Sequence, residues 1–369
     1  MIKIRAPGRI CLFGEHQDYL DYPVIAMAIS KYIYLKAKRI SEPLFIIELP
    51  DTNEFLEIKL DHKELEYESG RDYLKSGYNQ FLRRDVIFNK GYKIKIQGDI
   101  PIGAGVSSSS ALVMAWLSFL NLISNLRLDK NELANEGYNA EVREFNEAGG
   151  KMDFFTSIYG NLVYLDLQRG VKVTHFKTDL NGFILGNSLD KKNTVDDLLR
   201  VKNTAIEAFN ILSNLMPDFN KYETSLKEIQ PYLPNLEKKY QKSIEGNIKN
   251  RDITLEAREL ILNNLSLLRK NNAKSKIIIN FYTKLGILLN QHHAQLDKNI
   301  EVSTPKINKM INKCVESGAI GGKINGSGFG GTMFALAIGN EEKIAEVIKE
   351  MGGKAFQINT SQGINITCD

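Results

Sequence analysis

An α+β protein of two parts is the fold that the sequence predicts, and three observations lead to this prediction. Over the first part, several segments alternate apolar and polar residues, as in YKIKIQG at 92–98, which is typical of strands with one buried face. Further along, Leu and other apolar residues recur at helical spacing. The chain closes on a strand, a glycine loop, a strand and a helix over 321–352. Its 369 residues fit two domains, which we place at 1–170 and 171–369.

The elements of the first part follow from these patterns in chain order. A first strand at 2–6 is expected to end at Pro7-Gly8, because Pro and Gly interrupt regular structure. The remaining expected elements are a buried segment and strand at 23–38, a hairpin at 45–60, a helix at 72–91, a strand at 92–98, an apolar helix from Ser109 and a helix at 131–147.

The second part is predicted to be mainly helical. A strand-like stretch, GFILGNS, occupies 182–188. The expected helices lie at 196–213, 222–242, 251–271, 273–294 and 304–317. The final strand can return to either half, so the boundary near 170 is a loose one.

The composition excludes several classes of protein. With 48 Lys and Arg against 44 Asp and Glu, the net charge is only +4, whereas nucleic-acid binders usually carry a concentrated basic face. The three cysteines, Cys11, Cys314 and Cys368, have neither a disulfide nor a zinc spacing, which indicates a reducing compartment. The N-terminus lacks a secretory signal, and no run reaches 18 apolar residues. We therefore expect a cytoplasmic enzyme that binds neither nucleic acid nor a membrane.

A glycine- and serine-rich loop at 101–110 runs from a strand into the apolar helix. Glycines let a backbone approach a ligand closely, and the free amides at a helix N-terminus favour phosphate. Serine hydroxyls can add hydrogen bonds or a ligand to magnesium. The alternative is a structural turn in which Ser108 or Ser109 only caps the helix. The loop is not a Walker A motif, because no G-x-x-x-x-G-K-[ST] occurs.

A second glycine loop, GSGFGG, occupies 326–331. Its letters contain G-x-G-x-x-G, but a dinucleotide fingerprint should open a helix, and here the apolar run TMFALAI reads as a strand. A tight glycine hairpin is the structural alternative.

Polar residues cluster near the N-terminus, where Arg9, Glu15, His16, Asp18 and Tyr19 follow Pro7-Gly8. Such a set suits a hydrogen-bonding pocket for a polyol, and the alternative is an ordinary charged loop. A metal site at His16 is disfavoured, because no second histidine lies nearby in the sequence.

A further carboxylate, Asp153, follows the glycine pair Gly149-Gly150. Taken alone, it is expected to cap the segment FFTSIYG that comes after it.

Five ordered segments together resemble the GHMP kinases, the superfamily of galactokinase, homoserine kinase, mevalonate kinase and phosphomevalonate kinase. APGRICLFGEHQDY resembles the galactokinase signature, DIPIGAGVSSSSAL the phosphate loop, and KINGSGFGGTMFAL the third motif. AEVREFNEAGGKMD and GILLNQHHAQLDKNIEVSTPKINKMI also resemble family segments, so the likeness spans essentially the whole chain. It implies an N-terminal ribosomal-protein-S5-like α/β domain, a C-terminal ferredoxin-like α+β domain and an active site in the cleft.

The resemblance also implies an activity: an ATP-dependent sugar kinase, closest to galactokinases, that phosphorylates the anomeric hydroxyl of a monosaccharide. Asp153 and Arg9 match the catalytic pair, and Ser109 and Glu141 match the ligands of Mg²⁺. The residues implied to bind ATP are Pro101, Gly103, Ala104, Gly105, Val106, Ser107, Ser108 and Ser109. The residues implied to bind the sugar are Glu15, His16, Asp18, Gly150 and Gly328. A monomer is the default expectation.

Three departures from the galactokinase pattern surround the substrate. Residues 23–26, P-V-I-A, are nearer to the mevalonate kinase pattern, and DLLRVKNTAIEAF at 197–209 lacks the Y-x-x-R-R of galactokinases. Phe154 stands where a Gln is common. The sugar therefore stays open, and two alternatives are a mevalonate-type kinase and a non-catalytic sensor of sugar and ATP.

Overall fold

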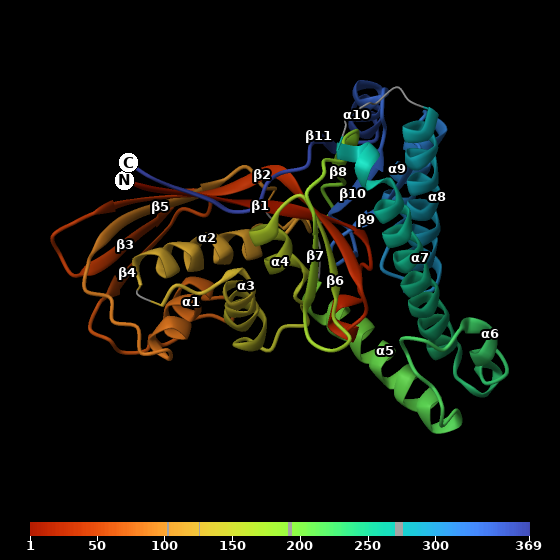
Figure 1. Ribbon diagram of the computed structural model, residues 1–369, viewed down its shortest axis with the longest axis horizontal. Coiled ribbons are helices and arrows are strands. Elements are labelled where there is room, and N and C mark those ends of the chain that lie inside the picture. Colours follow the sequence, from red (N-terminus) through yellow and green to blue (C-terminus); the bar gives the residue numbers. More distant parts are fainter. Residues whose placement is uncertain (102, 125, 191–193, 270–275) are drawn as a thin grey trace.

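The computed structural model describes residues 1–101, 103–124, 126–190, 194–269 and 276–369. These residues form two sheets with helices packed against them, so the α+β class is confirmed (Figure 1). None of the helices within these ranges is both long and apolar enough to cross a membrane.

The first sheet has eight strands in the described chain and is antiparallel except where β3 pairs with β5. Its strand order is β12-β1-β2-β5-β3-β4. In addition, β6 pairs with β2, and β7 pairs with β6. Its strands are β1 (Ile2–Phe13), β2 (Val24–Arg39), β3 (Leu44–Leu49), β4 (Glu54–Lys59), β5 (Tyr92–Gly98), β6 (Leu162–Asp166), β7 (Lys172–Phe176) and β12 (Asn365–Cys368).

The second sheet is antiparallel in the order β11-β8-β10-β9. Its strands are β8 (Phe183–Asn187), β9 (Gly321–Asn325), β10 (Thr332–Leu336) and β11 (Lys354–Ile358). The predicted division at residue 170 does not coincide with the division between the sheets, because β7 and β12 both belong to the first sheet. The last strand, β12, pairs with β1, so that Ile2 lies opposite Cys368.

Helices pack against both sheets and bury the apolar faces that the sequence patterns indicate. Helices α2 and α4 pack against the first sheet, α1 and α3 pack on these two helices, and a long antiparallel pair, α7 and α8, stands at the other end of the molecule (Figure 1). The helices are α1 (Tyr73–Leu82), α2 (Ser108–Ile123), α3 (Lys130–Tyr138), α4 (Met152–Tyr159), α5 (Thr194–Leu215), α6 (Leu226–Ile229), α7 (Lys238–Arg269), α8 (Lys276–Lys298), α9 (Pro305–Glu316) and α10 (Glu341–Glu350). Helix α2 is covered on most sides, and its Trp116 and Phe119 pack against Phe45 of β3.

Several predicted boundaries were wrong. Strand β1 does not end at Pro7-Gly8 but continues to Phe13, because shifts in its register with β2 absorb the irregular residues. The helix expected at 72–91 ends at Leu82. The helix expected at 131–147 is α helical only to Tyr138 and continues as a π-type turn at Asn139–Arg143.

The helices expected at 222–242 and 251–271 are replaced by α6, a short 3-10 turn and the single long helix α7. Pro231 and Pro234 keep α6 from continuing as one α-helix into α7, since proline removes a backbone donor and clashes with the preceding turn. The end of the predicted helix 251–271 and the start of 273–294 lie outside the described residues.

Candidate active site

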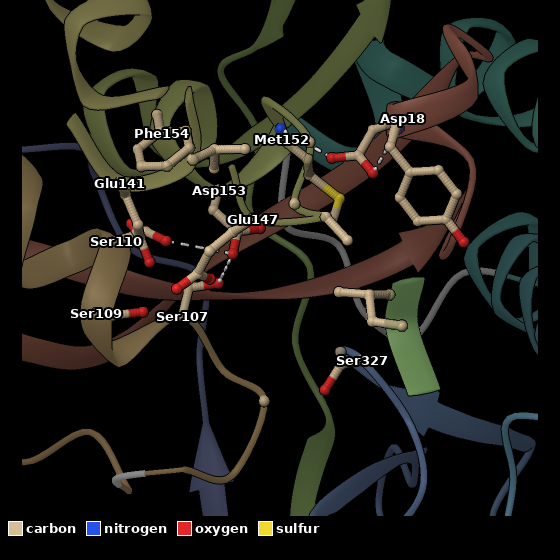
Figure 2. Close-up of a pocket in the computed structure, with 18 of the residues that line it drawn as sticks. Asp18, Ser107, Ser109, Ser110, Glu141, Glu147, Met152, Asp153, Phe154 and Ser327 are labelled. Atoms are coloured by element: carbon tan, nitrogen blue, oxygen red, sulfur yellow. Dashed lines mark hydrogen bonds between the residues drawn. The ribbon is translucent and has the colours of Figure 1, made fainter. Parts of the chain in front are cut away.

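A cavity of about 510 Å³ lies between the end of β1, the start of α2, the start of α4 and the loop after β9 (Figure 2). It brings together residues that are up to 318 positions apart in the chain (9 to 327). The predicted site residues that line it are Arg9, Glu15, His16, Asp18, Gly103, Gly105, Ser107, Ser108, Ser109, Glu141, Gly150 and Asp153.

Four predicted site residues lie outside this lining: Pro101, Ala104, Val106 and Gly328. Ala104 and Val106 are buried, so they can serve a ligand only through their backbone. Gly328 packs against the segment after α8 instead of facing the cavity, since a Cβ there would lie 2.5 Å from the Val302 carbonyl oxygen. Its predicted contact with substrate stays a prediction.

Helix α2 presents an uncapped N-terminus to the cavity. Its N-cap is Ser107, in the left-handed region with φ 62°, and the Ser107 side chain makes no capping hydrogen bond. The Ser107 hydroxyl instead donates to Asp153 Oδ2 at 2.6 Å. The alternative in which Ser108 or Ser109 only caps the helix does not hold, and the free amides together with the helix dipole favour an anion here.

The second glycine loop and its flanking strands hold the first. Asn325 Nδ2 donates to the Gly105 carbonyl at 2.8 Å, and the hydroxyl of Thr332, directly opposite in the β9–β10 pair, donates to the Ala104 carbonyl at 2.8 Å. Gly326 lies so close that a Cβ would stand 2.4 Å from the Gly105 oxygen. In a trans peptide the N–H points opposite to the C=O, so these contacts also orient the amides of Gly105 and Val106.

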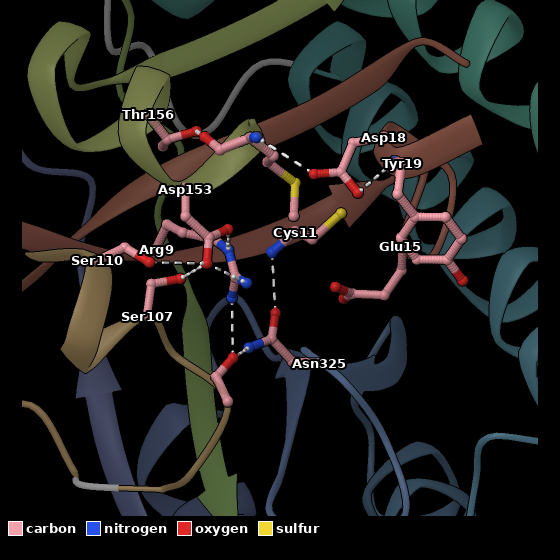
Figure 3. Close-up of polar contacts among 12 residues, drawn as sticks. Arg9, Cys11, Glu15, Asp18, Tyr19, Ser107, Ser110, Asp153, Thr156 and Asn325 are labelled. Atoms are coloured by element: carbon pink, nitrogen blue, oxygen red, sulfur yellow. Dashed lines mark hydrogen bonds and ion pairs between the residues drawn. The ribbon is translucent and has the colours of Figure 1, made fainter. Parts of the chain in front are cut away.

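Arg9 and Asp153 form a bidentate ion pair at the floor of the cavity (Figure 3). Arg9 Nε lies 2.6 Å from Asp153 Oδ1, and Nη2 lies 3.0 Å from Oδ2. Arg9 Nη1 also donates to the Gly105 carbonyl at 2.8 Å, which ties the pair to the phosphate loop. Burial works to lower the pKa of Arg9, but Asp153 and Glu15 raise it above its ordinary value, so the guanidinium is a permanent cation.

Asp153 lies in the first turn of α4, but it is not the N-cap, a place that Lys151 takes. The carboxylate instead accepts hydrogen bonds from Ser107 and, at 3.5 Å, from Ser110. Its side chain is 22% exposed, so it can still reach a ligand in the cavity. The capping alternative is thereby excluded.

Glu141 lies on the π-type turn and is buried beside the first turn of α2 (Figure 2). Its Oε2 atom has no hydrogen-bond partner among the described residues. Burial raises the pKa of Glu141 to about 7, although the hydroxyls of Ser109 and Ser110 oppose the shift. A buried carboxylate oxygen without a partner, next to hydroxyls, is a donor set that fits a hard cation such as Mg²⁺.

Glu141→Gln should stabilise the protein free of nucleotide and metal at pH 8. The pKa of Glu141 is raised on folding from 4.5 to about 7, so its contribution to stability is present below pH 4.5 and is lost as the pH rises through about 7. The difference in unfolding free energy at pH 8 is expected to be on the order of 3 kcal/mol. Denaturant unfolding at pH 4.5 and pH 8 measures it, and equal wild-type and variant stabilities at both values would contradict the account.

Glu15, Asp18 and Tyr19 lie at the end of the cavity beyond the Arg9–Asp153 pair (Figure 3), and His16 also lines the cavity. His16 Nδ1 hydrogen-bonds the Tyr19 hydroxyl at 3.0 Å. Burial and the nearby Asp153 raise the pKa of Asp18 to about 6. Among the described residues at this end, the carboxylates of Glu15 and Asp18 can accept hydrogen bonds and the Tyr19 hydroxyl can donate one. None of these side chains is an unpaired Arg or Lys.

Asp18 also supports the start of α4, since its Oδ2 accepts the Met152 amide at 3.2 Å. The chain passes so close that a Cβ on Gly150 would lie 2.0 Å from the same oxygen. Gly150 is therefore required for the approach between the N-terminal segment and the helix that carries Asp153.

Gly150→Ala should lower kcat/KM at least tenfold, because the new methyl group must displace the Asp18 carboxylate. Gly149→Ala is the matched control, since a Cβ there meets only a Val142 methyl, at 3.1 Å. Steady-state kinetics of the two variants measure the difference. Equal losses in both would show that Asp18 is not the contact that matters.

Sequence reasoning missed several residues at this site. Arg71 and Glu147 line the cavity and pair with each other at 3.2 Å, and Lys323 reaches Glu15 from β9. Arg71 lies outside every segment that carries the resemblance, and Glu147 lies inside AEVREFNEAGGKMD but was given no role. Lys323 does begin the third motif, and a lysine inside a buried strand is a signal that could have been used.

Comparison with known proteins identifies the family. Residues 72–161 match the GHMP kinases N terminal domain, residues 270–357 match the GHMP kinases C terminal domain, and residues 2–39 match the galactokinase galactose-binding signature. The chain belongs to the GHMP kinases. This GHMP kinase is a phosphotransferase with an alcohol group as acceptor, and its family uses ATP.

The relatives of this GHMP kinase include both galactokinases and mevalonate kinases. A galactokinase of Pyrococcus furiosus is 27% identical over an alignment of 382 residue positions, gaps included, that covers 99% of this chain and 99% of that protein. A mevalonate kinase of the same organism is 27% identical over 356 residues, covering 94% and 92%. The structure of Lactococcus lactis galactokinase complexed with galactose superimposes with a TM-score of 0.84 at 20% identity, over 99% of this chain and 95% of that one. The two-domain GHMP kinase fold is thereby confirmed, while sequence identity alone does not choose the acceptor.

Proposed function

We propose that this enzyme transfers the γ-phosphoryl group of ATP to the anomeric hydroxyl of a monosaccharide, either galactose or a related sugar. The match of residues 2–39 to the galactose-binding signature supports a sugar as acceptor. The strongest support for the proposal comes from the charges of the side chains that line the cavity.

Carboxylates outnumber cations among the described residues that line the cavity. Only two lining residues are Arg or Lys, namely Arg9 and Arg71, and each is already paired with a carboxylate. The carboxylates are Glu15, Asp18, Glu141, Glu147 and Asp153. An acceptor with its own carboxylate would find no unpaired cation among these side chains, whereas the hydroxyls of a neutral sugar can donate to Glu15 and Asp18.

The nucleotide phosphates are proposed to lie at the N-terminus of α2, where the uncapped amides and the helix dipole favour negative charge. The Ser109 hydroxyl and the Glu141 carboxylate would hold Mg²⁺, which neutralises charge on the phosphates when it is bound. Phosphoryl transfer needs positioning and charge neutralisation more than covalent chemistry, and this end of the cavity supplies both.

Asp153 is proposed to accept the proton of the attacking hydroxyl. Its hydrogen bonds with Arg9 and with Ser107 of the phosphate loop support a position between the proposed nucleotide and sugar ends. Arg9 orients the carboxylate through two hydrogen bonds, and the same guanidinium can stabilise charge on the transferring group.

A mevalonate-type activity is the second candidate, since a mevalonate kinase is as similar in sequence as a galactokinase. The P-V-I-A segment that suggested it does not bear on the substrate, however. Val24, Ile25 and Ala26 are buried in β2 and do not line the cavity.

The cytoplasmic location and the monomeric state stay predictions. The free thiols of Cys11, Cys314 and Cys368 support the cytoplasmic location.

A coupled assay of ADP release over a panel of monosaccharides and mevalonate tests the proposal. We expect turnover with galactose or a related aldose that depends on Mg²⁺. Preference for mevalonate over every sugar would replace this function with the second candidate. No turnover on any acceptor would instead favour the non-catalytic sensor.

A further inference from the structure

Lys323 of β9 is fully buried, yet it reaches the segment that carries the proposed sugar contacts. Its Nζ lies 2.9 Å from Glu15 Oε2 and 2.7 Å from the Cys11 carbonyl oxygen. The side chain is 0% exposed, and that of Glu15 is 3% exposed. A lysine in such a place is costly unless its charge is paired, so the contact with Glu15 is a strong structural constraint.

The same segment is held at a second point from the second half of the chain. The Gly14 amide donates to Nε2 of His292 on α8 at 3.2 Å. Burial and the nearby Lys323 lower the pKa of His292 well below its usual range, which leaves the ring neutral and able to accept this bond. The loop at 14–18 therefore takes its position from β9 and α8 as well as from its own strand.

We propose that Lys323 is a positioning residue for acceptor specificity: it fixes the Glu15 carboxylate through Oε2 and so aims Oε1 at a hydroxyl of the bound sugar. This inference rests on the proposed function, because it assigns Lys323 to the acceptor end of that site. The nucleotide end takes no contact from the Lys323 amine, whose bonds go to Glu15 and Cys11.

The position of Lys323 predicts a split between two Michaelis constants. Lys323→Met removes the charge but keeps a long apolar side chain, so it should raise KM for galactose, or for the best sugar of the panel, at least tenfold. KM for ATP should stay within about twofold. Loss of one partner from a buried ion pair also destabilises the fold, so stability has to be measured beside the kinetics.

Asn79→Ala is the control for stability alone. Asn79 is buried on α1, where it accepts the Leu65 amide at 2.8 Å and donates to the Leu65 carbonyl at 2.9 Å, and it does not line the cavity. This variant should lower the melting temperature without changing KM for either substrate. If it raises KM for the sugar as Lys323→Met does, loss of stability explains both and the inference fails.

The double variant Glu15→Gln with Lys323→Met separates positioning from packing. It contains no unpaired buried charge, so its melting temperature should exceed that of Lys323→Met. Its KM for the sugar should stay raised, because the Glu15 carboxylate is gone. An unchanged KM for the sugar in Lys323→Met, or equal rises for sugar and ATP, would overturn the inference. Absence of sugar turnover in the wild type would instead refute the proposed function itself.

Discussion

Asp153→Asn is expected to lower kcat by about 10³-fold while ATP still binds. The substitution keeps the size of the side chain but removes the carboxylate that we propose accepts the proton of the attacking hydroxyl, a role worth roughly 10²–10⁴-fold. The uncapped N-terminus of α2 and the Glu141 carboxylate are left in place, so the nucleotide end should be little affected. Single-turnover kinetics give the loss, and titration calorimetry with ATP gives the affinity.

The split between these two readouts is what identifies a general base. A variant that loses both turnover and ATP affinity would show that Asp153 mainly holds the phosphate loop through Ser107. A variant that keeps turnover within tenfold of the wild type would remove Asp153 from the proton transfer altogether.

Arg9→Ala is expected to cost both catalysis and stability. Arg9 is buried and makes three hydrogen bonds, two to Asp153 and one to Gly105. Its loss leaves a largely buried carboxylate without its cation, which typically costs about 3–5 kcal/mol. It also removes a preorganised positive charge beside the transferring group, for which a loss of about 10²–10³-fold in kcat is expected.

A double-mutant cycle with Asp153→Ala separates the two effects of Arg9→Ala. The double variant carries no unpaired charge at this place, so it should be more stable than Arg9→Ala alone. Its kcat should be no better than that of either single variant. Additive losses of stability in the cycle would mean that the bidentate pair does not couple the two residues.

Local patterns predicted most of the elements, and the failures have physical causes. The strand at 92–98 and the hairpin at 45–60 alternate clearly, and the structure confirms both. Strand β1 passes its Pro-Gly pair because its register with β2 shifts there, and pairing with a distant strand cannot be read from the local sequence. Strand β12 belongs to the first sheet because it pairs with β1, where Ile2 lies opposite Cys368. Pairing between residues so far apart in the chain cannot be read from the local sequence either.

The candidate site was predictable where a residue belongs to a motif and its side chain lines the cavity. Arg9, Glu141 and Asp153 come together in the cavity from three separate segments, as the resemblance implied. Lys323 escaped notice because its partner, Glu15, lies 308 positions away and only the fold makes them neighbours. Gly328 belongs to a motif but does not line the cavity, since its backbone packs on Val302, so its contact with substrate stays a prediction.

The position of the transferred phosphate is the most direct test of this account. Incubation of the enzyme with Mg²⁺, ATP and galactose, or the best sugar of the panel, should yield a sugar 1-phosphate. Phosphorus NMR coupled to the anomeric proton identifies that product, and Asp153→Asn should not form it at a comparable rate. A phosphate on any other hydroxyl of the sugar, or a phosphorylated mevalonate formed in preference to every sugar, would contradict the account.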